Sequence, residues 1–113
     1  MPGFNRIRVI DTGSISAGGF VDYSAAEEVD LVLKKILIVE ATGATINSVL
    51  LTFNLGDTPF FRPNVSAMIF HPSSPNVPEL NLDVPKGIKV NGRVTNNETA
   101  ARRLYIHLIY ESK

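Results

Sequence analysis

Apolar and polar residues alternate along much of this 113-residue chain, and such alternation is typical of half-buried β-strands. The clearest run places Val49, Leu51, Phe53 and Leu55 on one face of a predicted strand. A run near the end of the chain places Leu104, Ile106, Leu108 and Tyr110 on one face and Arg103, Tyr105, His107 and Glu111 on the other. Shorter runs over residues 6–10, 65–70, 80–84 and 88–95 follow the same rule. The pattern predicts a chain built from strands.

Turn-forming residues separate these runs. Residues 11–14 (Asp-Thr-Gly-Ser), 17–19, 41–43 and 96–97 are rich in Gly, Asn, Asp and Ser, which favour turns. Five of the seven prolines lie between Pro59 and Pro78. Because proline cannot donate to the ladder of a central strand, they predict two loops, over residues 57–64 and 71–79.

Residues 25–37 fit two interpretations. Ser24 and Glu27 have the spacing of a capping box, and Asp30 with Lys34 would form an i,i+4 pair, so a helix is one prediction. The run from residue 36 to residue 39, Ile-Leu-Ile-Val, is apolar on both faces and favours a buried strand instead. We favour a short turn over residues 25–28, followed by a strand over about residues 30–40.

Eight or nine strands spaced about 8–12 residues apart predict an all-β fold, an antiparallel β-sandwich with one domain over residues 1–113. The chain has no cysteine, so disulfide scaffolds and cysteine-based catalysis or zinc sites are excluded. Eleven basic and eleven acidic residues give no net charge, which argues against a specific nucleic-acid partner. No cofactor is expected.

The charges are unevenly placed. Between Ala41 and Pro78 the only charged residues are Asp57 and Arg62, so this stretch is either core or a surface that another chain covers. Its Asn, Thr, Ser and Pro residues argue against a membrane span. The first residues lack the apolar segment of a signal peptide, so we expect a protein that stays in the cytoplasm where it is made unless a larger assembly carries it out.

One motif suggests catalysis. Residues 11–14, Asp-Thr-Gly-Ser, follow an apolar strand and resemble the signature of aspartic proteases. In the dimeric retroviral type of that family two such aspartates share one proton, and the resemblance would make Asp11 the catalytic carboxylate. The sequence departs from the family because only ten residues precede Asp11 and because Val90-Asn91-Gly92 has Asn where the family has an apolar residue. A β-turn is the simpler interpretation.

The two histidines, His71 and His107, are far apart in the sequence and have no cluster of carboxylates beside them. No metal site is predicted, because one needs three or more converging ligands.

A proline-flanked pair of aromatic residues is the best non-catalytic candidate. Phe60 and Phe61 are adjacent, so both cannot point into the core of a strand-based fold. With Arg62 and Pro63 they have the composition of interface hot spots, and we predict an interface at Phe60, Phe61, Arg62 and Pro63. The alternative is that the two rings plug the open end of the sandwich.

Taken in order, the strand runs resemble single-jelly-roll proteins of virus particles, which form vertices (pentons) or decorate capsids. The likeness rests on the runs at residues 35–40, 48–55, 80–88, 94–97 and 103–110. The resemblance implies a jelly-roll-like sandwich and a virion location. It also implies self-association as a homo-oligomer, a trimer or a pentamer, together with other capsid proteins as partners. It carries no catalytic residues.

Three functions therefore follow from the sequence. The favoured one is a structural virion protein, not an enzyme, that self-associates to build or decorate a capsid. The second is a carbohydrate- or receptor-binding β-sandwich module, although the chain has no tryptophan, a residue that sugar sites often use. The third is a dimeric aspartic protease that uses Asp11.

Overall fold

Strands make up most of the regular structure in the computed structural model of this protein, which describes residues 5–61, 64–75 and 77–113. Within these ranges there are nine strands and one 3₁₀ helix, η1. Their bounds are β1 Asn5–Ile15, β2 Phe20–Ala25, β3 Leu31–Glu40, β4 Val49–Leu55, β5 Thr58–Pro59, β6 Val65–Ser66, η1 Ala67–Phe70, β7 Leu82–Val84, β8 Val90–Asn96 and β9 Arg102–Ser112.

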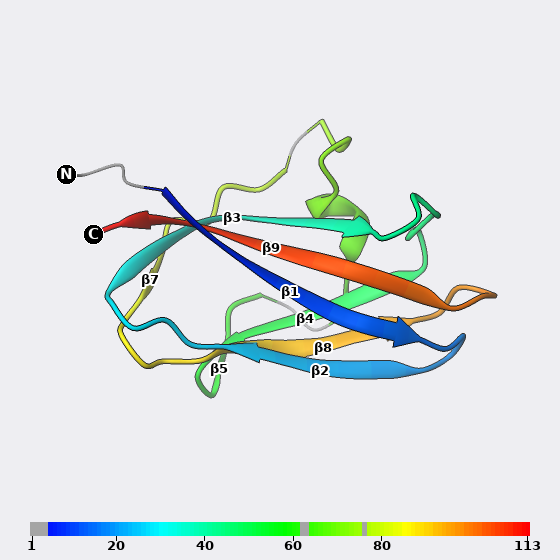
Figure 1. Cartoon of the computed structure of the whole chain (residues 1–113), viewed down its shortest axis with the longest axis horizontal. Coiled ribbons are helices and arrows are strands. Elements are labelled where there is room, and N and C mark those ends of the chain that lie inside the picture. The colour runs from blue at the N-terminus through cyan, green and yellow to red at the C-terminus, as the bar shows by residue number, and fades with distance from the viewer. Residues whose placement is uncertain (1–4, 62–63, 76) are drawn as a thin grey trace.

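The strands pair in a nested order. β1 pairs with β9, β2 with β8, β3 with β7, and β4 with β5, each antiparallel. Additional β3–β9 and β4–β8 pairs join these four ribbons into sheet A, in the order β1-β9-β3-β7, and sheet B, in the order β2-β8-β4-β5, with β6 also on β4 (Figure 1). This rolled, nested arrangement is a jelly roll. The prediction of an antiparallel, jelly-roll-like β-sandwich is confirmed.

The core lies between the two sheets and follows the predicted alternation. In β4 the side chains of Val49, Leu51 and Phe53 are buried, as predicted. The same holds in β9 for the set Leu104, Ile106, Leu108 and Tyr110. Ile88 is different, because it precedes β8 in a turn and 40% of its surface is exposed. β1 is the exception, because Ile7 and Val9 face away from the core and are exposed, and Arg8 lies on the inner side. The run over residues 6–10 therefore alternates as predicted but with its apolar residues outward.

Residues 25–37 hold no helix. β2 ends at Ala25, an irregular segment follows, and β3 begins at Leu31, close to the predicted start of the strand. Glu27, which would have closed the helical capping box, instead accepts two hydrogen bonds from the Arg8 guanidinium, at 2.9 and 3.2 Å. The strand wins because its inner side chains, among them Ile36 and Ile38, are fully buried between the sheets.

Two further local predictions were wrong. Residues 11–14 do not end a strand, since β1 continues to Ile15 through a register shift between Asp11 and Ser14, where Gly13 has a φ of +69°. The run over residues 65–70 is a strand only at Val65–Ser66 and then becomes η1. Ser66 caps this helix, because its hydroxyl accepts a hydrogen bond from the Met68 amide.

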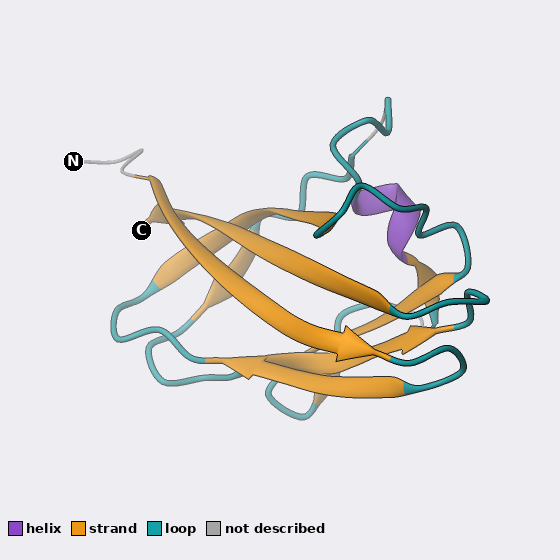
Figure 2. Cartoon of the chain, turned by 45° about the vertical axis from the view of Figure 1, so that its right-hand side comes forward, coloured by secondary structure: helices purple, strands orange, loops and turns teal. Residues whose placement is uncertain are grey.

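The two long edges of the sandwich differ in structure. β1 and β2 form one edge, whereas the opposite edge carries β7, the short strands β5 and β6, and η1. Figure 2 shows η1 and the loop after it above the strands, well away from β1. The proline-rich loop over residues 71–79 is tied to sheet A by a hydrogen bond from the Leu80 amide to the Lys34 carbonyl (2.8 Å).

Candidate functional site

The outer face of sheet A is the unusual surface of this protein. Backbone register places three rows of side chains across β1, β9 and β3 on the side away from the core. The rows are Ile7–Ile109–Lys35, Val9–His107–Leu37 and Asp11–Tyr105–Val39. We call the seven uncharged members of these rows the apolar face: Ile7, Val9, Leu37, Val39, Tyr105, His107 and Ile109.

This face is exposed where it reaches β1. Ile7 and Val9 have 60% and 51% of their surface exposed, and the other five members are partly exposed. An antiparallel sheet in a two-layer sandwich ordinarily shows polar side chains to water on its outer side. Here the outer sides of β3 and β9 also carry apolar side chains, Leu37 and Val39 on β3 and Tyr105 and Ile109 on β9, next to charged residues such as Lys35 and Arg103. Neighbouring apolar side chains exposed in this way mark a surface for another molecule.

Charged groups border the apolar face at one end. The Arg103 guanidinium pairs with the Asp11 carboxylate, with 2.5 Å between Nη2 and Oδ2, and lies 5.6 Å from the ring centroid of Tyr105. Together with the Gly13 amide, Arg103 lowers the pKa of Asp11 to about 2. The carboxylate of the protease-like motif is therefore held as an ion, whereas an aspartic protease needs its carboxylates to share a proton.

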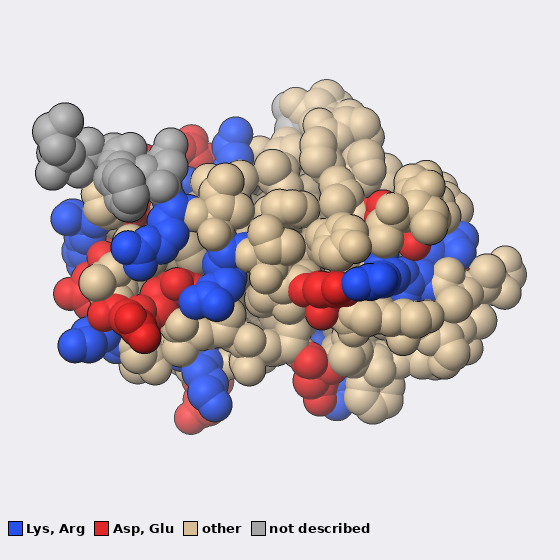
Figure 3. All heavy atoms as spheres, in the orientation of Figure 1, with Lys and Arg blue, Asp and Glu red and all other residues tan. Residues whose placement is uncertain are grey.

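A groove borders the apolar face at its other side. It has a volume of about 780 Å³ and lies between the strands and the proline-rich loop over residues 71–79. Leu37 and Ile109 form its floor, and Pro72, Pro75 and Val77 of the loop form its wall. Figure 3 shows charge gathered at the end of the molecule where both termini lie, and a broad surface without charge over its upper middle. The groove is also lined by Lys34, Lys35 and Glu111, so charged side chains lie beside its apolar residues.

His107 occupies the middle of the apolar face, between Val9 on β1 and Leu37 on β3. Its Nδ1 atom is buried and has no hydrogen-bond partner among the described residues. A buried polar atom without a partner costs free energy, so the His107 imidazole lowers the stability of the folded chain. No three His, Asp or Glu side chains gather as possible metal ligands in the described part of the chain.

The outer face of sheet B has the opposite character. We call it the polar face, and its members are Asp22, Ser24, Thr52, Asn54, Asn91 and Arg93. These groups bond to one another: Arg93 Nε pairs with Asp22 Oδ1 at 2.8 Å, and the Asn54 amide donates to Asn91 at 3.3 Å. Phe20 is exposed there, but the Arg93 guanidinium lies 3.9 Å from its ring centroid. A hollow of about 690 Å³ lies over this face.

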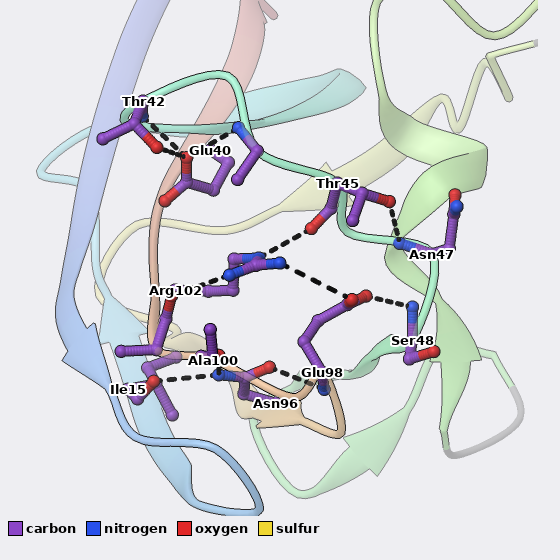
Figure 4. Close-up of polar contacts among 12 residues, drawn as sticks. Ile15, Glu40, Thr42, Thr45, Asn47, Ser48, Asn96, Glu98, Ala100 and Arg102 are labelled. Carbon is purple, nitrogen blue, oxygen red and sulfur yellow. Dashed lines mark hydrogen bonds and ion pairs between the residues drawn. The ribbon is translucent and has the colours of Figure 1, made fainter.

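The loops at the end of the sandwich that holds residues 41–48 and 97–101 are fixed by a polar network (Figure 4). Asn96 is fully buried, and its side-chain amide donates to the carbonyls of Ile15 and Ala100, at 2.9 and 3.0 Å. Its Oδ1 accepts from the Glu98 amide (2.9 Å). One side chain therefore joins the end of β1 to the β8–β9 loop.

Arg102 extends the same network to the β3–β4 loop. It projects between the two loops in Figure 4, where Nε donates to the Thr45 carbonyl (2.8 Å) and Nη2 lies 3.7 Å from Glu98 Oε1. The side chains of Arg102 and Glu98 are only 12% and 10% exposed. The Glu98 carboxylate also accepts a hydrogen bond from the Ser48 amide. These contacts make the loop end a rigid unit.

Glu40 anchors the start of the β3–β4 loop. Burial alone would raise the pKa of its carboxyl, but hydrogen bonds from Thr42, Ala44 and Arg103 outweigh burial and lower this pKa to about 2. The carboxylate is the acceptor for the amides of Thr42 (2.7 Å) and Ala44 (3.0 Å). The ionised form of Glu40 is thus part of the folded loop.

The structure packs the predicted aromatic pair against the core. Phe61 stacks on Phe53, with 5.6 Å between ring centroids, and also contacts the Phe70 ring at 5.7 Å. Phe60 meets the edges of the Phe53 and Phe61 rings and keeps 36% of its surface exposed. Arg62 and Pro63 lie outside the described residues. An interface at Phe60 and Phe61 stays a prediction, and both rings have an intramolecular role.

The apolar face was not predicted from the sequence, although a signal for it exists. Around Tyr105 and Ile109 the last strand is apolar on both sides, as the run over residues 36–39 also is. Two adjoining strands with this property leave one apolar side outside a two-layer fold. The signal becomes readable only once the two strands are known to be neighbours.

The sequence matches no protein-family model and no curated protein. In the part of the chain that the structure describes, no helix is long and apolar enough to cross a membrane.

Proposed function

We propose that this protein is a self-associating structural subunit of a virus particle, with no enzymatic activity. The observation that carries the proposal is the apolar face, because its exposed and half-exposed side chains gain from contact with another chain. The subunit builds or decorates a capsid, as a trimer or a pentamer beside other capsid proteins, and its location is the virion.

The fold supports the virion assignment. Jelly rolls are the domains of many viral capsids, and also of lectins, so the fold by itself leaves both classes in view. The apolar face then favours assembly, because the contact between copies of a protein is more apolar than an ordinary surface. A net charge of zero lets copies pack together without accumulating repulsion.

The rigid loop end also supports a structural role. Asn96, Glu98 and Arg102 use their polar atoms on neighbouring loops, so these groups hold the fold and are already bonded. The carboxylate of Asp11, the best catalytic candidate in the sequence, is likewise engaged by Arg103. Such arrangements suit a part that keeps its shape while neighbours bind.

One observation favours a second function, a carbohydrate- or receptor-binding module. The hollow over the polar face is lined by amide, hydroxyl and charged groups, among them Asn54, Thr52 and Asp22. Groups of this kind hydrogen-bond the hydroxyls of sugars. A glycan-binding screen with wild type and Asn54→Ala tests this function, which requires binding by the wild type and weaker binding by the variant.

Light scattering across a wide range of protein concentrations, followed by electron microscopy of the same samples, tests the assembly function. We expect the molar mass to rise to that of a discrete oligomer, and particles or rings of uniform size to appear. A molar mass that stays at the monomer value at the highest concentrations would contradict the proposal.

A further inference from the structure

β1 is a long strand with a free edge. It has 11 residues and pairs with β9 on one side, and no described strand pairs with it on the other side. The other edge strands are shorter, with six residues in β2, three in β7 and two in β5. An edge strand of this length that also exposes Ile7 and Val9 is a template for pairing with another chain.

We propose that β1 pairs antiparallel with β1 of a second copy, about a two-fold axis perpendicular to the sheet. This contact rests on the proposed self-association. Because a trimeric or pentameric ring has no two-fold axis between its own subunits, the contact joins subunits of neighbouring rings. An isologous contact of this kind brings the same residues together from both copies. It joins the two A sheets edge to edge and makes their apolar faces one continuous surface, which stays open for further copies to cover.

The arginines of β1 restrict the register. A two-fold axis at Arg8 would place Arg8 opposite the Arg8 of the second copy, and an axis at Ile7 would place Arg6 opposite Arg8. Like charges directly opposite each other destabilise a strand pair. An axis at Val9 avoids both clashes, because it places Arg8 opposite Ile10 and Arg6 opposite Thr12.

The irregular part of β1 excludes registers further along the strand. β1 pairs regularly with β9 from Asn5 to Asp11, and the register then shifts before Ser14. An axis at Ile10 would draw Thr12 and Gly13, which lie in the irregular part, into the new ladder. An axis at Val9 pairs the segment 7–11 with its own copy, and its ladder reaches the irregular part only at its end, where Arg6 lies opposite Thr12.

The Val9-centred register also suits the side chains. On the outer side Val9 meets Val9, and Ile7 lies opposite Asp11, whose charge is already balanced by Arg103. On the inner side Arg8 keeps its bond to Glu27, a residue with only 4% of its side chain exposed. No new uncompensated charge is buried, so the pairing gains ladder hydrogen bonds and apolar contact together.

Single cysteines test this register, because the natural chain has no cysteine. In Val9→Cys the two sulfurs lie on directly opposed residues, whose Cα atoms are about 5 Å apart in a ladder, within disulfide range. The matched control is Ile7→Cys, also exposed on the outer side of β1. In the proposed register its two copies are offset by four residues, about 13 Å, which is too far to bridge.

Both variants are oxidised mildly at a concentration where wild type self-associates, and the covalent dimer is followed on a non-reducing gel. We expect Val9→Cys to cross-link about tenfold faster than Ile7→Cys. Unfolding curves of the reduced variants establish that both are folded. Equal rates, faster cross-linking of Ile7→Cys, or no cross-linking in either variant would overturn the proposal.

The same samples separate the two proposals. If light scattering finds wild type to be an oligomer while Val9→Cys is not preferred, the β1 contact is wrong and self-association stands. If wild type is a monomer and neither variant cross-links, both proposals are wrong.

Discussion

The two outer faces of the sandwich have the same backbone geometry and opposite chemistry. The polar face of sheet B is hydrogen-bonded within itself, through the Asp22–Arg93 and Asn54–Asn91 pairs. The apolar face of sheet A has Ile7 and Val9 more than half exposed, and the buried Nδ1 of His107 at its middle has no partner among the described residues. One face is complete in the monomer, and the other is not.

The difference shows which residues folding by itself explains. Packing the two sheets accounts for the apolar inner side chains, because each sheet needs one apolar face. It gives no reason for apolar residues on the outer side of β1, β9 and β3 together. A single exposed Val or Ile on a surface is ordinary, whereas a connected group across three strands is the observation on which we propose contact with another chain.

The largest expected effect comes from placing a charge on the apolar face. Val9→Asp should weaken self-association roughly a thousandfold, because the two-fold contact sets the two new carboxylates directly opposite each other and because assembly covers the apolar face around them. Sedimentation equilibrium measures the change. The matched control is Ser24→Asp, also exposed on an edge strand but on the polar face, and it should leave association unchanged. Equal losses in both variants would mean that the two faces do not differ in role.

The next effect concerns the fold instead of the contact. Asn96→Ala removes the buried amide that bonds to Ile15, Ala100 and Glu98, and should lower the free energy of unfolding by about 3 kcal/mol. Urea unfolding measures this change. Because the network is remote from Val9 in the sandwich, the folded variant should associate as wild type does. A loss below about 0.5 kcal/mol would show that the loop end does not depend on Asn96.

Acid should weaken the loop end at a pH that Glu40 sets. The pKa of Glu40 is lowered from 4.5 to about 2 in the folded protein, so the unfolded chain binds more protons between these values. The stability that Glu40 contributes is therefore complete above about pH 4.5 and is lost as pH falls toward about 2. Glu40→Gln should show a shallower loss in urea unfolding measured across this range. An unchanged slope would contradict the assignment.

The smallest change in self-association is expected at His107, in the middle of the apolar face. His107→Phe replaces an imidazole that has an unpartnered buried nitrogen by an apolar ring of similar shape. The substitution should tighten self-association by about threefold, because the partly exposed side chain then presents only apolar surface to another copy. Weaker association, measured by sedimentation at the same concentrations, would indicate that the second copy bonds to the imidazole.

The alternation of apolar and polar residues predicted those strands whose inner and outer faces differ clearly in hydrophobicity. β4 and β9 alternate without interruption, and their inner residues such as Phe53 and Leu108 are buried as predicted. The sequence analysis did not predict β2, because this strand is short and follows Gly18 and Gly19. One of its inner residues is also Tyr23, which is buried with its hydroxyl donating a hydrogen bond to the Thr52 carbonyl. The residues next to Tyr23 in the sequence do not predict that contact.

The candidate site was beyond local pattern for a different reason. Ile7 and Val9 alternate with arginines, and the pattern alone does not say whether the odd or the even residues face the core. The pairing of β1 with β9, from opposite ends of the chain, decides it by placing Val9 beside His107. The pairing of β1 and β3 with β9 brings the residues of the apolar face together. This pairing between distant segments could not be predicted from a single sequence.

We propose that other copies of the chain cover the apolar face and leave the polar face free. Carbene footprinting at low and high protein concentration measures this directly, because labelling reports the solvent exposure of each peptide. If other copies cover the apolar face, we expect the labelling of residues 5–11 and 103–111 to fall as protein concentration rises and the labelling of residues 20–25 to stay constant. Constant labelling of all three segments, or a loss confined to residues 20–25, would contradict it.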